Sequence, residues 1–273
     1  MKNLVFLIMS LFCFGFFISC GDEKFEPYVY RDDRSALLPS EITELDENEA
    51  PVRTWHLKYD ILNRITSIRI DSVNGDGSMV NNITYHEGGN ITTESIIFSG
   101  TEVQSYFKQE CEFPDNVKKD QVLERIYNKN DTLLGTYTLN LKNERLITVK
   151  DVTDDVVYAY EYDSQENLIS ETYGSDSPYI LSYDSSIGMM SNIKTPQWLF
   201  LSGMWREKPI MPKVLEYSFG NSFSLLEYSN DSTQSVFEYE YGVNPVYPSK
   251  VLRDEVPYLT IKYILGNIFL DKE

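Results

Sequence analysis

Aromatic side chains gather in one stretch of the chain, TPQWLFLSGMWREKPIMP (residues 195–212). Trp198, Phe200 and Trp205 lie there between two prolines, and exposed rings of this kind can stack on sugar rings or hold an apolar ligand. We therefore take these three residues as candidate ligand-binding residues. The same rings could instead plug the mouth or the core of a sheet, because large aromatic residues mostly mark cores.

Oxygen ligands for a metal ion occur in DSVNGDGS (residues 71–78), where Asp71, Asn74 and Asp76 lie near two glycines. A calcium loop needs an oxygen ligand where Val73 stands, and it also needs a closing glutamate, which does not follow here. A hairpin turn explains the same residues. We therefore expect no metal site and no cofactor.

Residues for nucleophilic or acid–base catalysis show no favourable arrangement. The two histidines, His56 and His86, have neither the spacing of a metal pair nor a nearby catalytic partner. Cys111 lies between Glu110 and Glu112, whose charges would raise the pKa of a thiol, so we expect a buried strand residue. We predict no catalytic residue. A pair of glycosidase carboxylates stays open as an alternative, because acidic residues occur throughout the chain.

The elements that must position these residues are β-strands. Tyr and Phe alternate with acidic residues, most clearly where Phe237, Tyr239 and Tyr241 alternate with Glu238 and Glu240. A period of two places the aromatic rings on one face of a sheet and the acids on the other. Asp, Asn and Gly then follow, and these residues favour turns.

This design recurs along the chain, with several copies starting about 20–25 residues apart, which is enough for two strands and two turns. Clear copies are residues 57–68, 160–171 and 181–193, and weaker copies are residues 83–94, 139–149, 215–228 and 239–251. Each copy predicts a hairpin, and consecutive hairpins build an antiparallel meander. We expect an all-β meander that is curled into an open sheet or incomplete barrel and is soluble, because a lipid-facing barrel would need an apolar outer face.

The repeats carry a resemblance to a known family. Tyr59-Asp60 with Asn63-Arg64-Ile65, Tyr162-Asp163 with Asn167-Leu168, and Tyr183-Asp184 resemble YD repeats. Together with the N-terminal segment described next, they resemble a family of Bacteroides-type lipoproteins of unknown function that has a porin-like fold. The resemblance covers about residues 52–270. It implies a long, curling β-meander and no particular activity.

The N-terminal segment predicts the cellular localisation of the protein. Lys2 precedes an apolar run, Leu4 to Ile18, that has the length of a signal-peptide core and is too short to span a bilayer. Its end, Phe17-Ile18-Ser19-Cys20, resembles the lipobox of bacterial lipoproteins, with Phe17 where Leu is usual and Ile18 where a small residue is usual. The resemblance implies that residues 1–19 are a signal peptide and that Cys20 is acylated, as with palmitate. An uncleaved N-terminal anchor helix is the alternative.

Acidic residues dominate the stretch after Cys20. Asp22, Glu23 and Glu26 resemble the signal that exports Bacteroides-type lipoproteins to the outside of the outer membrane, and a solvated tether is the alternative. We expect residues 20–54 to be the lipidated cysteine and an acidic tether, with a helical turn near residues 39–47, and residues 55–273 to be the β domain. The net charge of −18 makes nucleic acid an unfavourable partner.

These features predict a lipid-anchored protein of the outer membrane of a Gram-negative bacterium, displayed on the cell surface. Its function would be non-catalytic binding or interaction, with a glycan, a peptide or an outer-membrane protein as partner. A polymer-degrading hydrolase with paired carboxylates in a concave face is one alternative. A purely structural scaffold is another.

Overall fold

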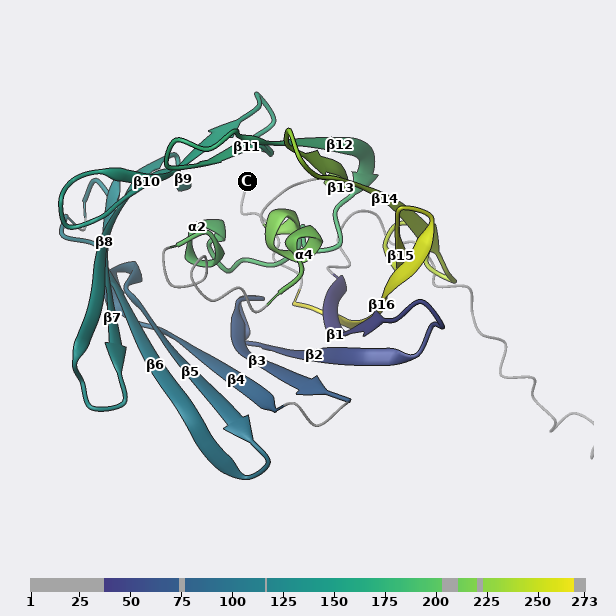
Figure 1. The fold of residues 1–273 in the computed structure, drawn as a ribbon, viewed down its shortest axis with the longest axis horizontal. Helices are drawn as coiled ribbons and strands as arrows, with labels where there is room; N and C mark the ends of the chain where they lie inside the picture. Colours follow the sequence, from purple (N-terminus) through teal and green to yellow (C-terminus); the bar gives the residue numbers. More distant parts are fainter. Residues whose placement is uncertain (1–36, 74–76, 116, 203–210, 220–222, 268–273) are drawn as a thin grey trace, which may run out of the picture. The chain divides into compact units, whose positions relative to one another are not determined.

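The computed structural model describes residues 37–73, 77–115, 117–202, 211–219 and 223–267, all of which belong to one compact unit, Asp33–Glu273. Sixteen antiparallel strands follow one another in this part of the chain (Figure 1). The strands are β1 Leu37–Leu45, β2 Pro51–Tyr59, β3 Ile65–Ser72, β4 Ser78–Tyr85, β5 Ile91–Ser99, β6 Glu102–Glu112, β7 Gln121–Asn128, β8 Leu133–Lys142, β9 Arg145–Lys150, β10 Val156–Tyr162, β11 Leu168–Tyr173, β12 Tyr179–Ile187, β13 Phe223–Ser229, β14 Gln234–Tyr241, β15 Pro248–Arg253 and β16 Val256–Leu265. The helical segments are η1 Glu87–Gly89, α2 Gln197–Phe200 and α4 Lys213–Ser218.

The sheet closes on itself, so the prediction of an open sheet or incomplete barrel is wrong. Each strand pairs with its neighbour in the chain, and β1 pairs with β16 to complete a closed barrel. The seam is a full antiparallel ladder that includes Thr43 opposite Thr260, and it carries an ion pair of 2.7 Å between Lys262 Nζ and Glu41 Oε1. Closure satisfies the strand edges that an open sheet would leave unpaired.

Strand β1 also changes the expected start of the sheet. The helical turn predicted near residues 39–47 is wrong, because Leu37–Leu45 is a strand that buries Leu38 and Ile42 in the barrel interior. Four of its nine residues are polar, among them Glu41 and Glu44, and the strand lies in an acidic part of the sequence. The β domain therefore begins at residue 37 rather than at residue 55, and residues 37–54 belong to the wall instead of the predicted tether.

The predicted alternation of inward aromatics and outward acids is confirmed. Phe237 is buried while Glu238 and Glu240 on either side of Tyr239 are exposed. In β10, Tyr160 is buried and Glu161 is exposed. The acids of these alternating stretches therefore lie on the outside of the barrel.

The interior is filled by the segment between β12 and β13, which we call the plug and whose described residues are 188–202 and 211–219. Helices α2 and α4 lie inside the ring of strands (Figure 1). A barrel of about 16 strands is too wide for inward side chains alone to fill. Leu199, Phe200 and Leu215 of the plug are at most 1% exposed and belong to the same apolar core as the wall.

Two of the predicted hairpins are wrong for this reason. Residues 181–193 begin in β12 but enter the plug after Ile187, and residues 215–228 begin in α4 before β13. The Tyr-Asp pair at Tyr183 therefore precedes the point at which the chain leaves the wall. The other five predicted units each contain a turn between paired strands, as at Tyr59–Ile65.

Five of the turns share one design in which an Asp or Asn side chain replaces missing backbone contacts. The Oδ1 atom accepts hydrogen bonds from the backbone N–H groups two and four residues later, and the residue three positions later has a positive φ. Five residues open such turns: Asp46, Asp60, Asn128, Asp151 and Asp163. The Asp of the YD motif is thus a turn residue.

Replacing Asp163 tests this role. We expect Asp163→Ala to lower the free energy of unfolding by about 1 kcal/mol, because the N–H groups of Gln165 and Asn167 lose their acceptor. Asp163→Asn keeps an amide oxygen, as Asn128 does at the equivalent position, and should cost less than half as much. Urea denaturation measures both. Equal losses for Ala and Asn would contradict the role of the side-chain oxygen.

The barrel end that holds the turns opened by Asp60 and Asp163 is called the plug end. Near this end, tyrosine hydroxyls connect neighbouring strands. On even-numbered strands, five inward tyrosines donate to a backbone carbonyl of the preceding strand: Tyr59 to Pro39 at 2.6 Å, Tyr85 to Ile65 at 2.9 Å, Tyr183 to Leu168 at 2.7 Å, Tyr239 to Leu225 at 2.5 Å and Tyr263 to Pro248 at 2.9 Å. Tyr59 and Tyr183, the tyrosines of two Tyr-Asp pairs, therefore both pack against the core and satisfy a wall carbonyl.

Candidate binding pocket at the plug end

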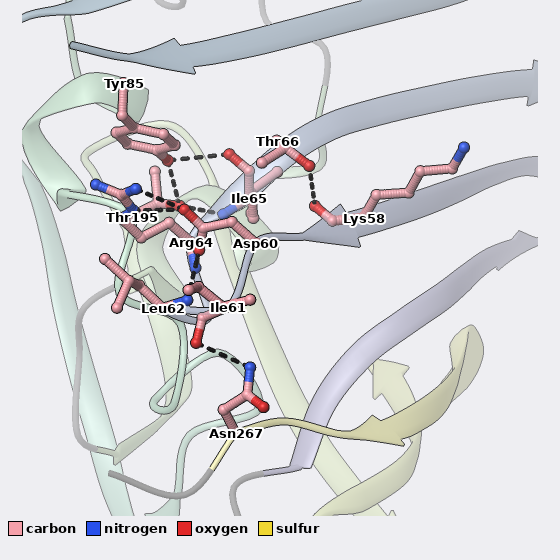
Figure 2. A network of polar contacts seen from close by, with 10 residues as sticks. All are labelled: Lys58, Asp60, Ile61, Leu62, Arg64, Ile65, Thr66, Tyr85, Thr195 and Asn267. Carbon is pink, nitrogen blue, oxygen red and sulfur yellow. Dashed lines mark hydrogen bonds and ion pairs between the residues drawn. The ribbon is translucent and has the colours of Figure 1, made fainter.

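The turn between β2 and β3 forms a polar network that reaches the plug (Figure 2). Arg64 lies with Nη2 2.6 Å and Nε 2.7 Å from Asp60 Oδ2, and its guanidinium lies 4.0 Å from the centre of the Tyr85 ring. Burial raises the pKa of Asp60, but the hydrogen bonds from Arg64 and Leu62 outweigh it, and the pKa is lowered. The turn's contribution to stability is thus complete above about pH 4 and is lost as the pH falls through the lowered pKa.

Thr195 of the plug completes this network. Its Oγ1 accepts a hydrogen bond of 2.7 Å from the backbone N–H of Ile65 and lies 2.9 Å from the Tyr85 hydroxyl (Figure 2). The next residue back, Lys194, donates its backbone N–H to the carbonyl of Asn63 at 3.0 Å. A wall N–H that would otherwise be unpaired in a buried position is therefore satisfied by the plug.

Removing that hydroxyl tests whether it fixes the plug to the wall. We expect Thr195→Val to lower the free energy of unfolding by about 1–3 kcal/mol, because the buried Ile65 N–H loses its acceptor and the side-chain shape is kept. Thr195→Ser keeps the hydroxyl and should lose less than half of that amount. Urea denaturation followed by tryptophan fluorescence measures the loss. A Val variant as stable as the wild type would show that the contact is unimportant.

A pocket of about 470 Å³ opens beside this contact, between the plug and four turns of the wall. The wall residues come from the β4–β5, β6–β7, β8–β9 and β10–β11 connections, and the plug supplies residues 191 and 193–198. All of these connections lie at the plug end, because the even-numbered strands end there. The volume is within the range of small-molecule sites, which is about 300–1,000 Å³.

Charged side chains from different turns meet at this pocket. Lys119 and Lys194 line it with Arg145, and the acids are Glu144 and Glu166. Arg145 Nη1 donates to Gln197 Oε1 at 3.1 Å, and its Nη2 lies 3.4 Å from Glu166 Oε2. Within the described part of the chain, neither lysine has an ion-pair partner.

A second pocket of about 480 Å³ shares Asn143, Arg145 and Glu166 with the first. It continues along β9 and β10, whose paired residues stop at Thr148 and Ala159 on the side nearest the plug end. Arg145 and Glu166 therefore border both pockets. Their ion pair is common to the linings of both pockets.

The aromatic candidates lie in the plug rather than on an exposed platform. Trp198 is 3% exposed, and its ring packs edge-on against Phe113, 5.9 Å away between centroids. Trp198 lines the pocket, whereas Phe200 is 1% exposed and stacks on Phe219 in the core, with centroids 4.0 Å apart. Trp205 lies outside the described residues. The pocket thus brings in one of the three predicted residues.

The cationic residues of the pocket escaped sequence reasoning. Lys119 and Arg145 are 26 positions apart in the chain, and Arg145 and Lys194 are 49 positions apart. The three residues belong to no shared motif. Only the fold brings their turns together. The usable signal was the position of Lys119 and Arg145 beside turns that would lie at one end of a meander.

Buried carboxylates inside the barrel already have hydrogen-bond partners. Glu124 is 0% exposed and accepts a hydrogen bond of 2.8 Å from Gln109 Nε2. Glu171 is 5% exposed and accepts one from the hydroxyl of Tyr217 in α4. Gln109 also donates to Ser202 Oγ of the plug at 2.8 Å, so both carboxylates belong to hydrogen-bond networks between the wall and the plug. They face the packed interior and do not line the pocket.

Other residues singled out from the sequence have structural positions. The expectation that Cys111 is buried in a strand is confirmed, and burial with the nearby Glu124 charge raises the pKa of its thiol. His86 lies 2.9 Å from Thr92 Oγ1 beside a turn. On the outer wall, His56 Nε2 lies 3.3 Å from Asp71 Oδ2. Asn74, Asp76 and Cys20 lie outside the described residues.

The described residues contain no group of three or more His, Cys, Asp or Glu side chains arranged to hold a metal ion. In the same part of the chain, no helix combines the length and apolar character needed to cross a membrane.

Comparisons with known proteins give structural likenesses at low identity. No family model and no curated protein matches the sequence. A porin-like protein from Bacteroides uniformis is similar in structure, with a TM-score of 0.47 and 12% identity over 84% of this chain and 96% of that one. A β-barrel-like protein of a domain of unknown function from Brucella abortus gives a TM-score of 0.21 and 10% identity over 86% of this chain and 99% of that one.

Proposed function

We propose that this protein is a lipid-anchored binding protein of the bacterial cell envelope, and that the pocket at the plug end is its ligand site. The observation that carries the proposal is the pocket itself: about 470 Å³, formed by four turns and the plug, with an apolar lining and two lysines that have no ion-pair partner among the described residues. Binding has more support than hydrolysis, because one of the two pocket acids, Glu166, is ion-paired with Arg145 and is therefore not free to act together with Glu144.

The side chains on the outer wall favour a barrel whose outer face is exposed to water. Charged residues on neighbouring strands pair there, as Arg125 does with Glu112 at 2.7 Å and Lys262 does with Glu41 at 2.7 Å. Acids such as Glu238 point outward as well. A barrel that spans lipid needs an apolar outer band, and this wall presents charge in its place. Attachment to the membrane then falls to the N-terminus.

The proposed anchor rests on the sequence Phe17-Ile18-Ser19-Cys20 and the acidic residues that follow it. Several acyl chains on one cysteine would hold the protein firmly, whereas a single chain would be marginal. Display on the cell surface is part of the proposal. It would place the pocket where extracellular glycans or peptides can reach it.

The anchor is tested by expressing the full chain in a Gram-negative host supplied with an alkyne analogue of palmitate. We expect a labelled mature protein whose N-terminus is Cys20, and no label in the Cys20→Ala variant. Protease added to intact cells should cleave the wild-type protein if it is displayed on the surface. A mature chain that begins at Met1 without label would contradict the anchor.

The binding role is tested with the mature lipoprotein in dodecyl maltoside micelles, applied to a glycan array and to outer-membrane extracts. Lys194→Trp places a bulky ring at the rim of the pocket and should abolish capture of whatever the wild type retains. Lys129→Trp makes the same change in the turn between β7 and β8 at the opposite barrel end and should leave capture intact. Equal capture by all three proteins, or capture by none, would contradict the proposed site.

A further inference from the structure

We infer that the pocket at the plug end binds an organic anion, a ligand that joins a carboxylate or phosphate group to a ring-sized body. This inference deepens the proposed function and rests on it. The chain as a whole is acidic, with a net charge of −18. Lys119, Arg145 and Lys194 nevertheless converge on one concave surface, where they outnumber the two acids, Glu144 and Glu166. Cations that converge in a cleft favour anionic ligands.

Lys119 is held close to the pocket wall by its surroundings. Its Nζ lies 5.5 Å from the centre of the Phe113 ring, a cation–π arrangement. Gly89 opposite it has a φ of +93°, and a Cβ atom there would lie 3.2 Å from Lys119 Nζ. The glycine therefore leaves room for the ammonium group, which carries no ion-pair partner among the described residues.

Arg145 offers a second anchoring group that a ligand can recruit. Its guanidinium has one good hydrogen bond, to Gln197 at 3.1 Å, and a long contact of 3.4 Å to Glu166. The Glu166 side chain is 58% exposed, and an exposed ion pair contributes little to stability. A ligand carboxylate or phosphate could therefore replace Glu166 and take two parallel N–H bonds from the guanidinium.

The apolar lining argues for an organic molecule rather than a bare inorganic ion. Leu141, Ile193, Pro196 and Trp198 line the same pocket as the cations. The volume of about 470 Å³ fits a molecule the size of one or two sugar rings better than a single phosphate ion. An acidic sugar combines a ring-sized body with a fixed negative charge, so we choose it as the probe.

The test is isothermal titration of the mature lipoprotein in dodecyl maltoside micelles at low salt with glucuronate, glucose 6-phosphate, inorganic phosphate and glucose. We expect the two sugar anions to bind and glucose to show no heat of binding, with inorganic phosphate weaker than glucose 6-phosphate. Lys119→Glu with Lys194→Glu should weaken glucuronate binding at least about tenfold, the effect of losing about 1.4 kcal/mol.

Two further variants sharpen the result. Lys129→Glu reverses an exposed charge at the opposite barrel end and should leave the dissociation constant within about twofold of wild type, since distant exposed charges are screened. Glu166→Gln removes the carboxylate that competes for Arg145 and should tighten glucuronate binding several-fold. Because Lys119, Lys194 and Glu166 are exposed, urea midpoints should stay close to wild type.

Each outcome decides a separate point. Glucose binding as tightly as glucuronate, or no sugar anion binding, would overturn the inference. If the wild type captures a neutral glycan on the array and Lys194→Trp loses that capture, the pocket remains the binding site. Only the preference for an anion then fails. Binding of inorganic phosphate equal to glucose 6-phosphate would overturn the role assigned to the apolar lining.

Discussion

Phe200→Ala should lower the free energy of unfolding by about 3–5 kcal/mol, which corresponds to a fall in melting temperature of about 6–20 °C for a chain of this size. The ring is 1% exposed and stacks on Phe219 with an interplanar angle of 20°. Truncation leaves a cavity at the centre of the barrel and removes the ring pair. Differential scanning calorimetry and urea denaturation measure the loss.

The controls for this prediction separate packing from general sensitivity. Phe200→Leu keeps most of the buried volume and should cost less than half as much. Ile61 is 79% exposed at the tip of a turn, and Ile61→Ala should change stability by less than about 0.5 kcal/mol. If Phe200→Ala were as stable as the Ile61 variant, the plug would not be packed against the wall.

Ile42→Ala should cost about 2–5 kcal/mol, the usual range for truncating a fully buried aliphatic side chain. Ile42 is 1% exposed and lies opposite Trp55 on β2 and Ile261 on β16, so it packs at the closing seam. Ile42→Val removes one methylene and should cost about 0.5–1.5 kcal/mol. Urea denaturation of the purified full-length protein measures both.

This second prediction also locates the start of the folded unit. From sequence, residue 42 belonged to a tether, and truncating a tether residue would leave stability unchanged. A destabilised Ile42→Ala variant, with Ile42→Val in between, places β1 inside the cooperative barrel. No loss in either variant would restore the boundary at residue 55.

The wall could be predicted from sequence because its signal is local. Alternation at Phe237–Tyr241 fixes which face each residue takes, and the Asp of two Tyr-Asp pairs, Asp60 and Asp163, marks a turn. These patterns need only a few neighbouring residues. They predicted the strands, the turns and the polar outer face without any knowledge of the complete sheet.

Closure could not be predicted, because it depends on residues at opposite ends of the chain. Thr43 and Thr260 are paired in the seam but are separated by more than 200 residues. No local pattern states whether the accumulated twist and tilt of successive strands bring the two ends together. The acidic residues that flank β1, together with its own Glu41 and Glu44, also made this strand resemble part of a tether.

The plug and the pocket were hidden for related reasons. Helices α2 and α4 have four and six residues, too few for a helical period to appear in the sequence. The pocket gathers Lys119, Arg145 and Lys194 from three separate connections, and their meeting follows only from the closed wall and its plug. The density of aromatic residues indicated Trp198 as a candidate. It could not tell a residue that lines a pocket, such as Trp198, from one packed in the core, such as Phe200.

The central claim is that the wall closes between β1 and β16, and cysteine cross-linking tests it most directly. Thr43 lies opposite Thr260 across the seam and opposite Thr54 within the first hairpin. Paired strand positions fall within the Cα separation that a disulfide spans, about 4.4–6.8 Å. Under mild oxidation we predict that the double variant Thr43→Cys, Thr260→Cys forms a disulfide as completely as the hairpin control Thr43→Cys, Thr54→Cys. If the hairpin pair cross-linked while the seam pair stayed reduced in the folded protein, the barrel would be open at this point.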